Sequence, residues 1–229
     1  MSAKDSGARG RKPLIARLLD LFFPPKCVFC RRLLKEEEQE ICAACQNSLP
    51  WVTEDTPPKR VENVGRCAAP LWYRDEVRES FHRYKFQGQD FYARVYGKLM
   101  AQCVRDRLGL GFDAVTWAPL SQKRKKQRGY DQAELLARAV GSELDKPVIP
   151  ILRKVKHTAA QSSLESDEAR AQNAAGAYEI ADPAAAEGKQ ILLVDDIVTT
   201  GATLSNCAGV LLDAGAKEVR AVTFARAHR

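Results

Sequence analysis

The feature that most constrains the fold is the segment 191–204 (ILLVDDIVTTGATL), where an apolar run ends in two adjacent aspartates. A short run such as QILLV at 190–194 is typical of a strand buried on both faces of a parallel sheet. Asp195 and Asp196 then lie at the carboxyl end of this predicted strand, and a turn of small and hydroxyl residues leads into a predicted helix over 203–214. Because ligands bind beyond the carboxyl ends of the strands in such sheets, the segment is also the first candidate for a binding site.

The turn at 199–203 has the chemistry of a ribose-phosphate site. Carboxylates at a strand end can accept hydrogen bonds from a ribose diol, and backbone N–H groups at the start of a helix can bind a phosphate group. A glycine at 201 allows the backbone to approach a ligand closely. The sequence therefore predicts catalytic roles for Asp195 and Asp196, and ligand-binding roles for Thr199, Thr200, Gly201, Ala202 and Thr203.

Three other interpretations of this segment are less favoured. A nucleotide hydrolase also places acids after a strand, but it needs a G-x-x-x-x-G-K-[ST] loop that the sequence does not contain. A pocket in which an acid accepts a phosphoryl group fits poorly, because a phosphate-binding turn follows the acidic pair directly. A plain solvated turn does not explain three hydroxyl residues and a glycine within five positions.

Four of the seven cysteines form two C-x-x-C pairs near the N-terminus. Two such turns can present four thiolates to one tetrahedral zinc ion and close a structural site. Redox pairs or disulfides are the competing interpretation, which a cytosolic chain disfavours. We predict zinc ligation by Cys27, Cys30, Cys42 and Cys45, and ordinary packed thiols at Cys67, Cys103 and Cys207.

The alternation of apolar runs with amphipathic segments predicts an α/β chain with a parallel sheet flanked by helices. Strands are expected at 112–120, 190–194 and 219–224, and helices at 77–85, 91–108, 132–144 and 203–214. The polar stretch 153–180 lacks a period and is expected to form a lid. The predicted divisions are 1–25, a basic tail with a short amphipathic helix; 26–50, the four-cysteine zinc module; 51–68, a linker; and 69–229, the main domain.

The net charge of +7 and the pI near 9.1 favour a polyanionic partner, which could be a pyrophosphate-bearing metabolite, a nucleic acid or an anionic membrane. Five cations occur within residues 123–128 (KRKKQR). This basic cluster is compatible with a solvated face, with attraction of a diphosphate ligand and with contact to a nucleic-acid backbone.

The apolar stretch 14–23 is shorter than the roughly 20 residues that cross a bilayer, and Arg17 and Asp20 interrupt it. We expect no membrane span and a cytoplasmic location. A short helix packing on the protein is favoured over a peripheral membrane anchor.

Several short motifs accompany the acidic turn along nearly the whole chain. They are residues 22–30, 84–86 (YKF), 117–120 (WAPL), 128–132 (RGYDQ), 158–161 (TAAQ), 170–173 (RAQN) and 195–204. With these motifs the sequence resembles the ComF family of competence-associated proteins, in which a zinc-binding cysteine module precedes a phosphoribosyltransferase-like domain. The resemblance implies a type I phosphoribosyltransferase-like α/β fold.

The resemblance also implies a ligand, which is phosphoribosyl diphosphate or a related ribose phosphate, with Mg²⁺ bridging diphosphate and ribose oxygens. The turn at 119–122 would face the pyrophosphate, and the lid would carry Arg153, Lys154, Lys156 and Arg170 over it. Family members often have Arg-Gly-Phe-Asn where this chain has Tyr130 and Asp131, which puts a direct role of Asp131 in doubt. The further ligand-binding residues implied are Leu120, Ser121, Lys123, Arg128, Thr158 and Gln161.

Two functions follow from the resemblance. The first is a ligand-binding protein that assists the handling of single-stranded DNA during DNA uptake, with single-stranded DNA and a competence helicase as partners. The alternative is an active Mg²⁺-dependent phosphoribosyltransferase that transfers ribose 5-phosphate to a base or an amine. The sequence shows a donor site for both and leaves open whether the protein is an enzyme.

Overall fold

The computed structural model describes residues 23–86, 90–155 and 176–227. The chain divides into two compact units, Met1–Ser48 and Leu49–Arg229. The predicted N-terminal helix and residues 156–175 of the predicted lid lie outside the described residues.

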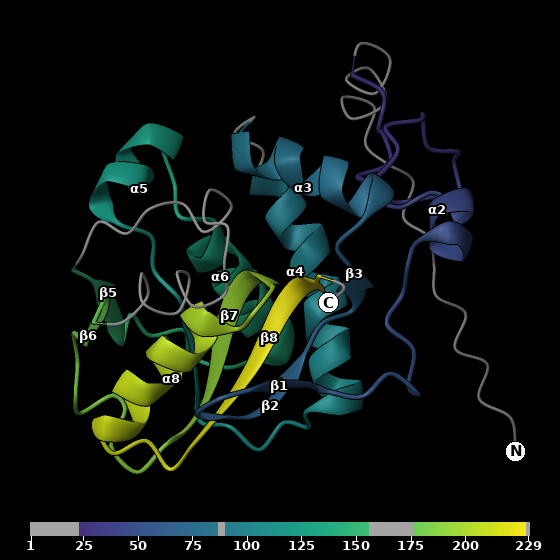
Figure 1. Cartoon of the computed structure of the whole chain (residues 1–229). Helices are drawn as coiled ribbons and strands as arrows, with labels where there is room; N and C mark the ends of the chain where they lie inside the picture. Colours follow the sequence, from purple (N-terminus) through teal and green to yellow (C-terminus); the bar gives the residue numbers. More distant parts are fainter. Residues whose placement is uncertain (1–22, 87–89, 156–175, 228–229) are drawn as a thin grey trace, which may run out of the picture. The chain divides into compact units, whose positions relative to one another are not determined.

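The larger unit is built on a six-stranded sheet (Figure 1). Its strands are β1 (Lys59–Val61), β2 (Val64–Ala68), β3 (Leu71–Trp72), β4 (Ala114–Trp117), β7 (Gln190–Val198) and β8 (Glu218–Arg226). The order across the sheet is β1-β2-β8-β7-β4, and the short β3 also pairs with β8. All neighbours are parallel except β1 and β2, which are antiparallel. The predicted parallel sheet is thus confirmed, with one antiparallel strand added at its edge.

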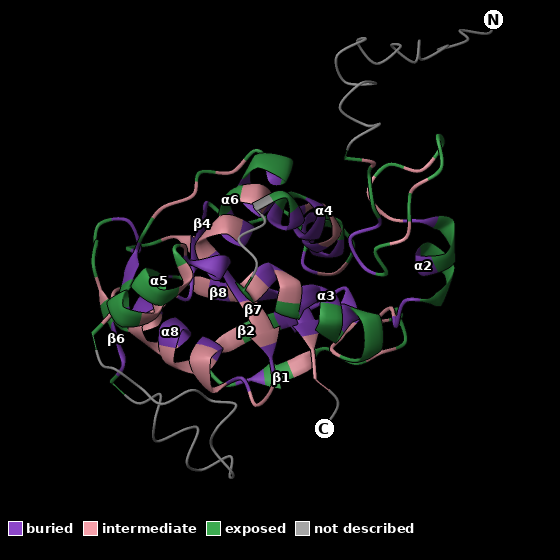
Figure 2. Ribbon diagram, turned by 90° about the horizontal axis from the view of Figure 1, so that it is seen from above, coloured by how far each residue is buried: buried purple, intermediate pink, exposed green. Residues whose placement is uncertain are grey.

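Helices cover both faces of the sheet. They are α3 (Asp75–Phe86), α4 (Asp90–Arg107), α5 (Gln122–Arg128), α6 (Gln132–Leu144) and α8 (Ala202–Asp213). Helices α4 and α6 pack on each other, α4 also packs on β8, and α6 on β4 and β7. Helix α8 covers the other face, as Figure 2 shows from above. The four helices predicted from the sequence are confirmed, each within about two residues of its predicted ends.

The place of β7 in the sheet explains why the run at 191–194 is apolar throughout. Side chains of a strand alternate between the two faces of a sheet. Ile191 and Leu193 belong to the hydrophobic cluster that includes residues of α8. Leu192 and Val194, which alternate with them along the strand, are equally buried. On the face that α4 and α6 cover, these two helices pack closely on each other. A Cβ atom added at Gly97 of α4 would lie only 2.4 Å from the Cβ atom of Ala139 in α6. A strand with helices on both sides needs apolar side chains on both.

Two segments differ from the sequence prediction. Residues 51–68, expected as a linker, contain β1 and β2, and β2 pairs with β8 inside the main sheet. The predicted lid begins and ends in a two-stranded antiparallel sheet formed by β5 (Leu152–Lys154) and β6 (Tyr178–Ile180). Both differences arise because the strands are short and charged, so their pairing depends on partners far along the chain.

The smaller unit contains helix α2 (Ala43–Ser48) and a bridge between Lys26 and Leu33. Val28 and Phe29 are buried, as are Cys27, Cys42 and Cys45. In small modules of this kind a bound metal ion commonly supplies much of the folding free energy. Among the described helices of the whole chain, none has the length and the apolar character needed to cross a lipid bilayer.

Candidate functional site

The two aspartates at the end of β7 lie in different environments. Asp195 is 9% exposed, and burial together with the neighbouring charge of Asp196 raises its pKa well above the usual range. Asp196 is more exposed and pairs with the ammonium group of Lys85 at 2.9 Å. The pair therefore presents one buried carboxyl group that favours its protonated form and one carboxylate that is balanced by a cation.

Lys85 is a site residue that the sequence did not assign a role. It lies near the end of α3, and its ammonium group lies 4.6 Å from the ring centre of Phe81. The only sequence signal was its place in the YKF motif at 84–86. Lys85 and Asp196 are 111 positions apart in the sequence, so only the tertiary fold reveals the ion pair.

The turn that follows β7 passes through a left-handed glycine directly into a helix N-terminus. Gly201 takes the left-handed conformation with φ of +93°, and a Cβ atom there would lie 2.8 Å from a methyl group of Val61. The turn leads directly into α8, which begins at Ala202. The partial positive charge of a helix N-terminus favours an anion at this point. The hydroxyl of Thr200 accepts a hydrogen bond from the N–H of Ala202 at 3.3 Å, which closes the turn locally.

Leu120 and Ser121 lie just after β4, which is the parallel neighbour of β7. They therefore lie at the same edge of the sheet as the aspartates. Ser121 is the N-cap of α5, where its hydroxyl accepts from the N–H of Arg124 at 3.5 Å. Lys123 is exposed on that helix. The basic cluster is thus a short helix, and none of its residues is buried.

Arg128, the last residue of α5, is half-buried. Its guanidinium group donates to the side-chain oxygen of Gln132 at 2.7 Å and lies 5.5 Å from the ring centre of Phe86. Burial lowers the pKa of Arg128, and the charge of Asp196 acts in the opposite direction. The structure therefore brings Arg128 into the electrostatic field of the acidic pair.

The structure gives Asp131 the role of a buried helix cap. It is 3% exposed and caps α6, accepting from the N–H groups of Ala133 at 3.1 Å and Glu134 at 3.3 Å. Its second oxygen accepts from the N–H of Leu120 at 2.7 Å. One side chain thus ties the loop after β4 to the start of α6, and the doubt about a direct ligand role is explained by this buried position.

Lys154 approaches the site from β5. Its ammonium group donates to the hydroxyl of Tyr178 at 3.1 Å and lies 4.8 Å from the ring centre of the same tyrosine. Burial lowers the pKa of Lys154, while the charge of Asp195 is among those that raise it. Arg153, the other described cation of the predicted lid, instead pairs with Glu179 at 3.0 Å on the surface. Lys156, Thr158, Gln161 and Arg170 lie outside the described residues.

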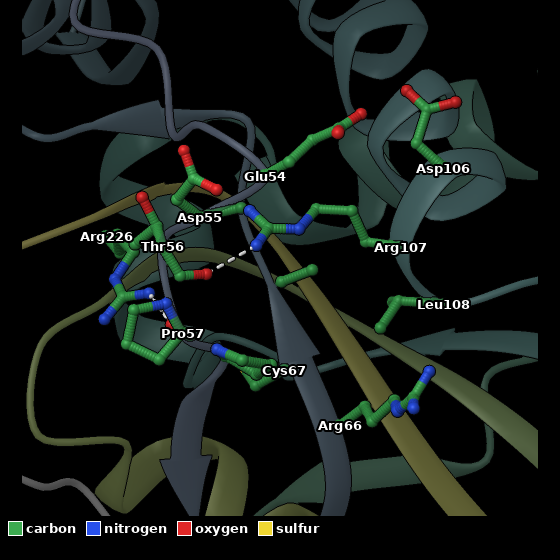
Figure 3. Close-up of a pocket in the computed structure, with 13 residues that line it drawn as sticks. Glu54, Asp55, Thr56, Pro57, Arg66, Cys67, Asp106, Arg107, Leu108 and Arg226 are labelled. Atoms are coloured by element: carbon green, nitrogen blue, oxygen red, sulfur yellow. Dashed lines mark hydrogen bonds between the residues drawn. The ribbon is translucent and has the colours of Figure 1, made fainter.

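A cavity of about 480 Å³ lies elsewhere in the larger unit, between the loop 54–58, β2 and the end of α4 (Figure 3). Arg107 donates to the carbonyl of Thr56 at 2.7 Å, and Arg226 donates to the carbonyl of Pro57 at 2.8 Å. Both arginines therefore hold the loop in place. No site residue predicted from the sequence lines this cavity.

The four predicted zinc ligands come together in the smaller unit. Their sulfur atoms all lie within 4.8 Å of one another, and those of Cys30 and Cys42 are 3.6 Å apart. A tetrahedral site with Zn–S bonds of about 2.3 Å needs sulfur separations of roughly 3.8 Å, so the donor set fits zinc. Burial raises the pKa of Cys42, but hydrogen bonding with Arg32 and Cys45 outweighs this and brings it to about 6. Cys27, Cys42 and Cys45 are buried, whereas Cys30 is exposed.

Family comparisons agree with both units. A family model described as phosphoribosyl transferase domain matches residues 130–229, and one described as double zinc ribbon domain matches residues 18–59. With the sheet described above, the first match confirms the predicted fold of the type I phosphoribosyltransferase kind. The second confirms a four-cysteine zinc ribbon at the N-terminus.

Similar proteins cover nearly the whole chain. Competence protein F of Haemophilus influenzae is 30% identical over 228 residues, which are 90% of this chain and 99% of that protein. Competence protein ComFC of Streptococcus pneumoniae is 26% identical over 211 residues, covering 85% of this chain and 91% of its own length. DNA utilization protein YhgH of Escherichia coli is 28% identical over 230 residues, with 87% and 96% covered. The zinc ribbon, the acidic turn and these full-length similarities together show that the chain belongs to the ComF family of competence-associated proteins.

Proposed function

We propose that the protein binds phosphoribosyl diphosphate or a related ribose phosphate at the acidic turn, and that it uses this site in the handling of single-stranded DNA during DNA uptake in the cytoplasm. The observation that carries the first part is the continuous element formed by Asp195, Asp196 and the turn at 199–203. It offers carboxylates for the ribose hydroxyls and a helix N-terminus for the phosphate.

Three cations support a ligand of high negative charge. Lys85 and Arg128 lie in the field of Asp196, and Lys154 lies in that of Asp195. Such cations compensate the hydration that a diphosphate loses on binding. Mg²⁺ prefers oxygen ligands. The diphosphate and ribose of the ligand would supply most of these oxygens, and the ion would offset the negative charge of the diphosphate.

Calorimetry with ribose 5-phosphate and phosphoribosyl diphosphate, each with and without Mg²⁺, tests this site. The expected result is binding by the parent protein and a loss of affinity of at least tenfold in Asp196→Asn. The matched control is Asp213→Asn, which neutralises an exposed aspartate at the far end of α8 and leaves binding unchanged. Equal affinity of the parent and the Asp196→Asn variant, or no binding by the folded parent, would refute the site.

The role with single-stranded DNA rests on the relatives' names and on α5. Lys123 and Lys126 are exposed on this helix. Each phosphate contact on a single strand contributes about 0.7 to the slope of log K against log salt. The variant Lys123→Gln/Lys126→Gln should therefore bind a single strand more weakly and with a slope smaller by roughly 1.4. The control Lys189→Gln/Lys217→Gln removes two lysines beside the starts of β7 and β8 and should leave the slope unchanged.

Catalysis is the second candidate function, in which ribose 5-phosphate passes to a base or an amine with release of pyrophosphate. The observation that favours it is the unequal environment of the two aspartates: Asp195 is buried, which raises its pKa, and Asp196 pairs with Lys85 at 2.9 Å. Pyrophosphate release on mixing the protein with the donor, Mg²⁺ and a panel of bases tests it. Release that disappears in Asp196→Asn supports an enzyme, whereas no release with any base leaves binding as the function.

A further inference from the structure

Phe86 is an aromatic side chain on the surface next to the candidate site. It is the last residue of α3, and 60% of it is exposed. His82, one turn earlier on the same helix, lies with its ring centre 4.7 Å from that of Phe86. The guanidinium group of Arg128 lies 5.5 Å from the Phe86 ring centre. The ring is thus flanked by two polar groups while most of its surface faces solvent.

One ion pair ties the end of α3 to the acidic pair, and two hydrogen bonds tie it to residues 130–132. Lys85, its neighbour in sequence, pairs with Asp196 at 2.9 Å. The hydroxyl of Tyr130 donates to the carbonyl of Tyr84, and the hydroxyl of Tyr84 donates to the carbonyl of Gln132 at 2.8 Å. These bonds fasten the end of α3 to the segment between α5 and α6. The exposed ring is therefore held in a defined place at the rim of the site.

A single exposed hydrophobic residue needs no functional explanation by itself. Phe86 differs because a cation lies beside its ring and an ion pair lies next to it in sequence. Proteins recognise unpaired bases by stacking them on exposed aromatic and arginine side chains while nearby cations contact the phosphates. The chemistry of this surface matches a planar base that is joined to a phosphate.

We propose that Phe86, flanked by His82 and Arg128, is a stacking platform for a nucleobase. The base belongs either to a nucleotide whose ribose phosphate occupies the acidic turn, or to a single DNA strand that passes over the site. In the first case the inference rests on the proposed ribose-phosphate site, and in the second it does not. The shared chemistry is the aromatic face of the base, and the two sources are separated by experiment.

The test uses two pairs of probes that differ in whether they carry a base. AMP is compared with ribose 5-phosphate by calorimetry with Mg²⁺, and a short thymidylate strand is compared with an abasic strand of equal length by fluorescence anisotropy. In Phe86→Ala, affinity for the base-bearing probe of at least one pair should fall about 5- to 150-fold, the range for the loss of one stacked base. Affinity for its base-free counterpart should not change.

Two control variants separate stacking from other effects. Phe86→Trp keeps an aromatic face and should retain affinity for the base-bearing probe. Phe91→Ala removes another exposed phenylalanine, at the start of α4 and 42% exposed, and should leave all four affinities unchanged. Because Phe86 is exposed, its removal should also leave the melting temperature unchanged, which shows that the variant is folded.

The outcomes are distinct for the two proposals. Failure of the parent to bind phosphoribosyl diphosphate, ribose 5-phosphate and AMP refutes the ribose-phosphate site, but a base-dependent loss of strand binding in Phe86→Ala still supports the platform. The platform is overturned if Phe86→Ala binds every probe as the parent does, if it loses base-bearing and base-free probes equally, or if the parent binds neither base-bearing probe.

Discussion

Replacing Gly201 with alanine tests whether the turn after β7 is held by backbone conformation and close packing. A non-glycine residue in the left-handed conformation costs about 1–2 kcal/mol, and the smaller entropy of the unfolded chain offsets roughly 0.4–1 kcal/mol of this. The added Cβ atom would also lie 2.8 and 3.1 Å from the two methyl carbons of Val61. Overpacking of this kind costs about 1–3 kcal/mol. The expected loss for Gly201→Ala is therefore about 1–5 kcal/mol, with a central value of about 3 kcal/mol.

Gly129 provides a matched control. It also has a positive φ, of +80°, but nothing lies within 4 Å of the Cβ atom that alanine would add. Gly129→Ala should thus show the backbone cost alone, about 1 kcal/mol. The difference of about 2 kcal/mol between the two variants corresponds to roughly 4–8 °C in melting temperature for a domain of this size.

Urea unfolding followed by tryptophan fluorescence is the suitable assay, because Trp51, Trp72 and Trp117 all lie in the larger unit. Val61→Ala shortens the side chain that the new methyl group would meet, so the double variant Gly201→Ala/Val61→Ala should recover the packing part of the loss in a double-mutant cycle. The reasoning fails if Gly201→Ala is no less stable than Gly129→Ala, or if Val61→Ala recovers nothing.

Three further perturbations test other parts of the structure. Burial raises the pKa of Asp131. The protonated acid therefore stabilises the fold fully below its unfolded pKa near 3.8, and this contribution is lost as pH rises through the folded pKa. Asp131→Asn keeps an accepting oxygen without the charge, so the stability of this variant in urea relative to the parent should increase from pH 4 upward. Cys42→Ser should lose most of the bound zinc in metal analysis, since the three remaining thiolates leave one position of the tetrahedron open. The control Cys103→Ser should keep one zinc per chain. Full metal retention in Cys42→Ser would contradict the site. Lys85→Met should weaken ribose 5-phosphate binding in calorimetry by about tenfold, because it removes the cation that offsets the charge of Asp196 and so leaves the site less favourable to an anion. Lys85→Arg, which keeps the charge, should retain binding.

The zinc ribbon and the acidic turn could be predicted because their chemistry is local. Two C-x-x-C turns bring paired thiolates to one point whatever the rest of the chain does. In the same way, an apolar strand followed by Asp195 and Asp196, a glycine at 201 and a helix specifies its own geometry within fourteen residues, 191–204. The helices of the larger unit were predictable for a related reason, since each carries its apolar period within its own length.

The surroundings of the site could not be predicted in this way. Lys85 pairs with Asp196, the oxygen of Asp131 accepts from the amide of Leu120, and the guanidinium group of Arg128 lies over the ring of Phe86. Apart from the contact between positions 120 and 131, these partners belong to elements that are distant along the chain. No local pattern records which of them will meet.

The sequence by itself thus determined four of the helices, the strand at 190–194, the four zinc ligands and the acidic turn, because spacing and side-chain chemistry act over a few residues. Only the tertiary structure decided that β1 and β2 join the sheet, that Asp195 is buried while Asp196 is balanced by Lys85, and that Phe86 lies at the rim of the site. The physical reason is that burial and pairing are set by which elements pack together. That choice depends on the whole hydrophobic core, on both faces of the sheet, and on no single segment.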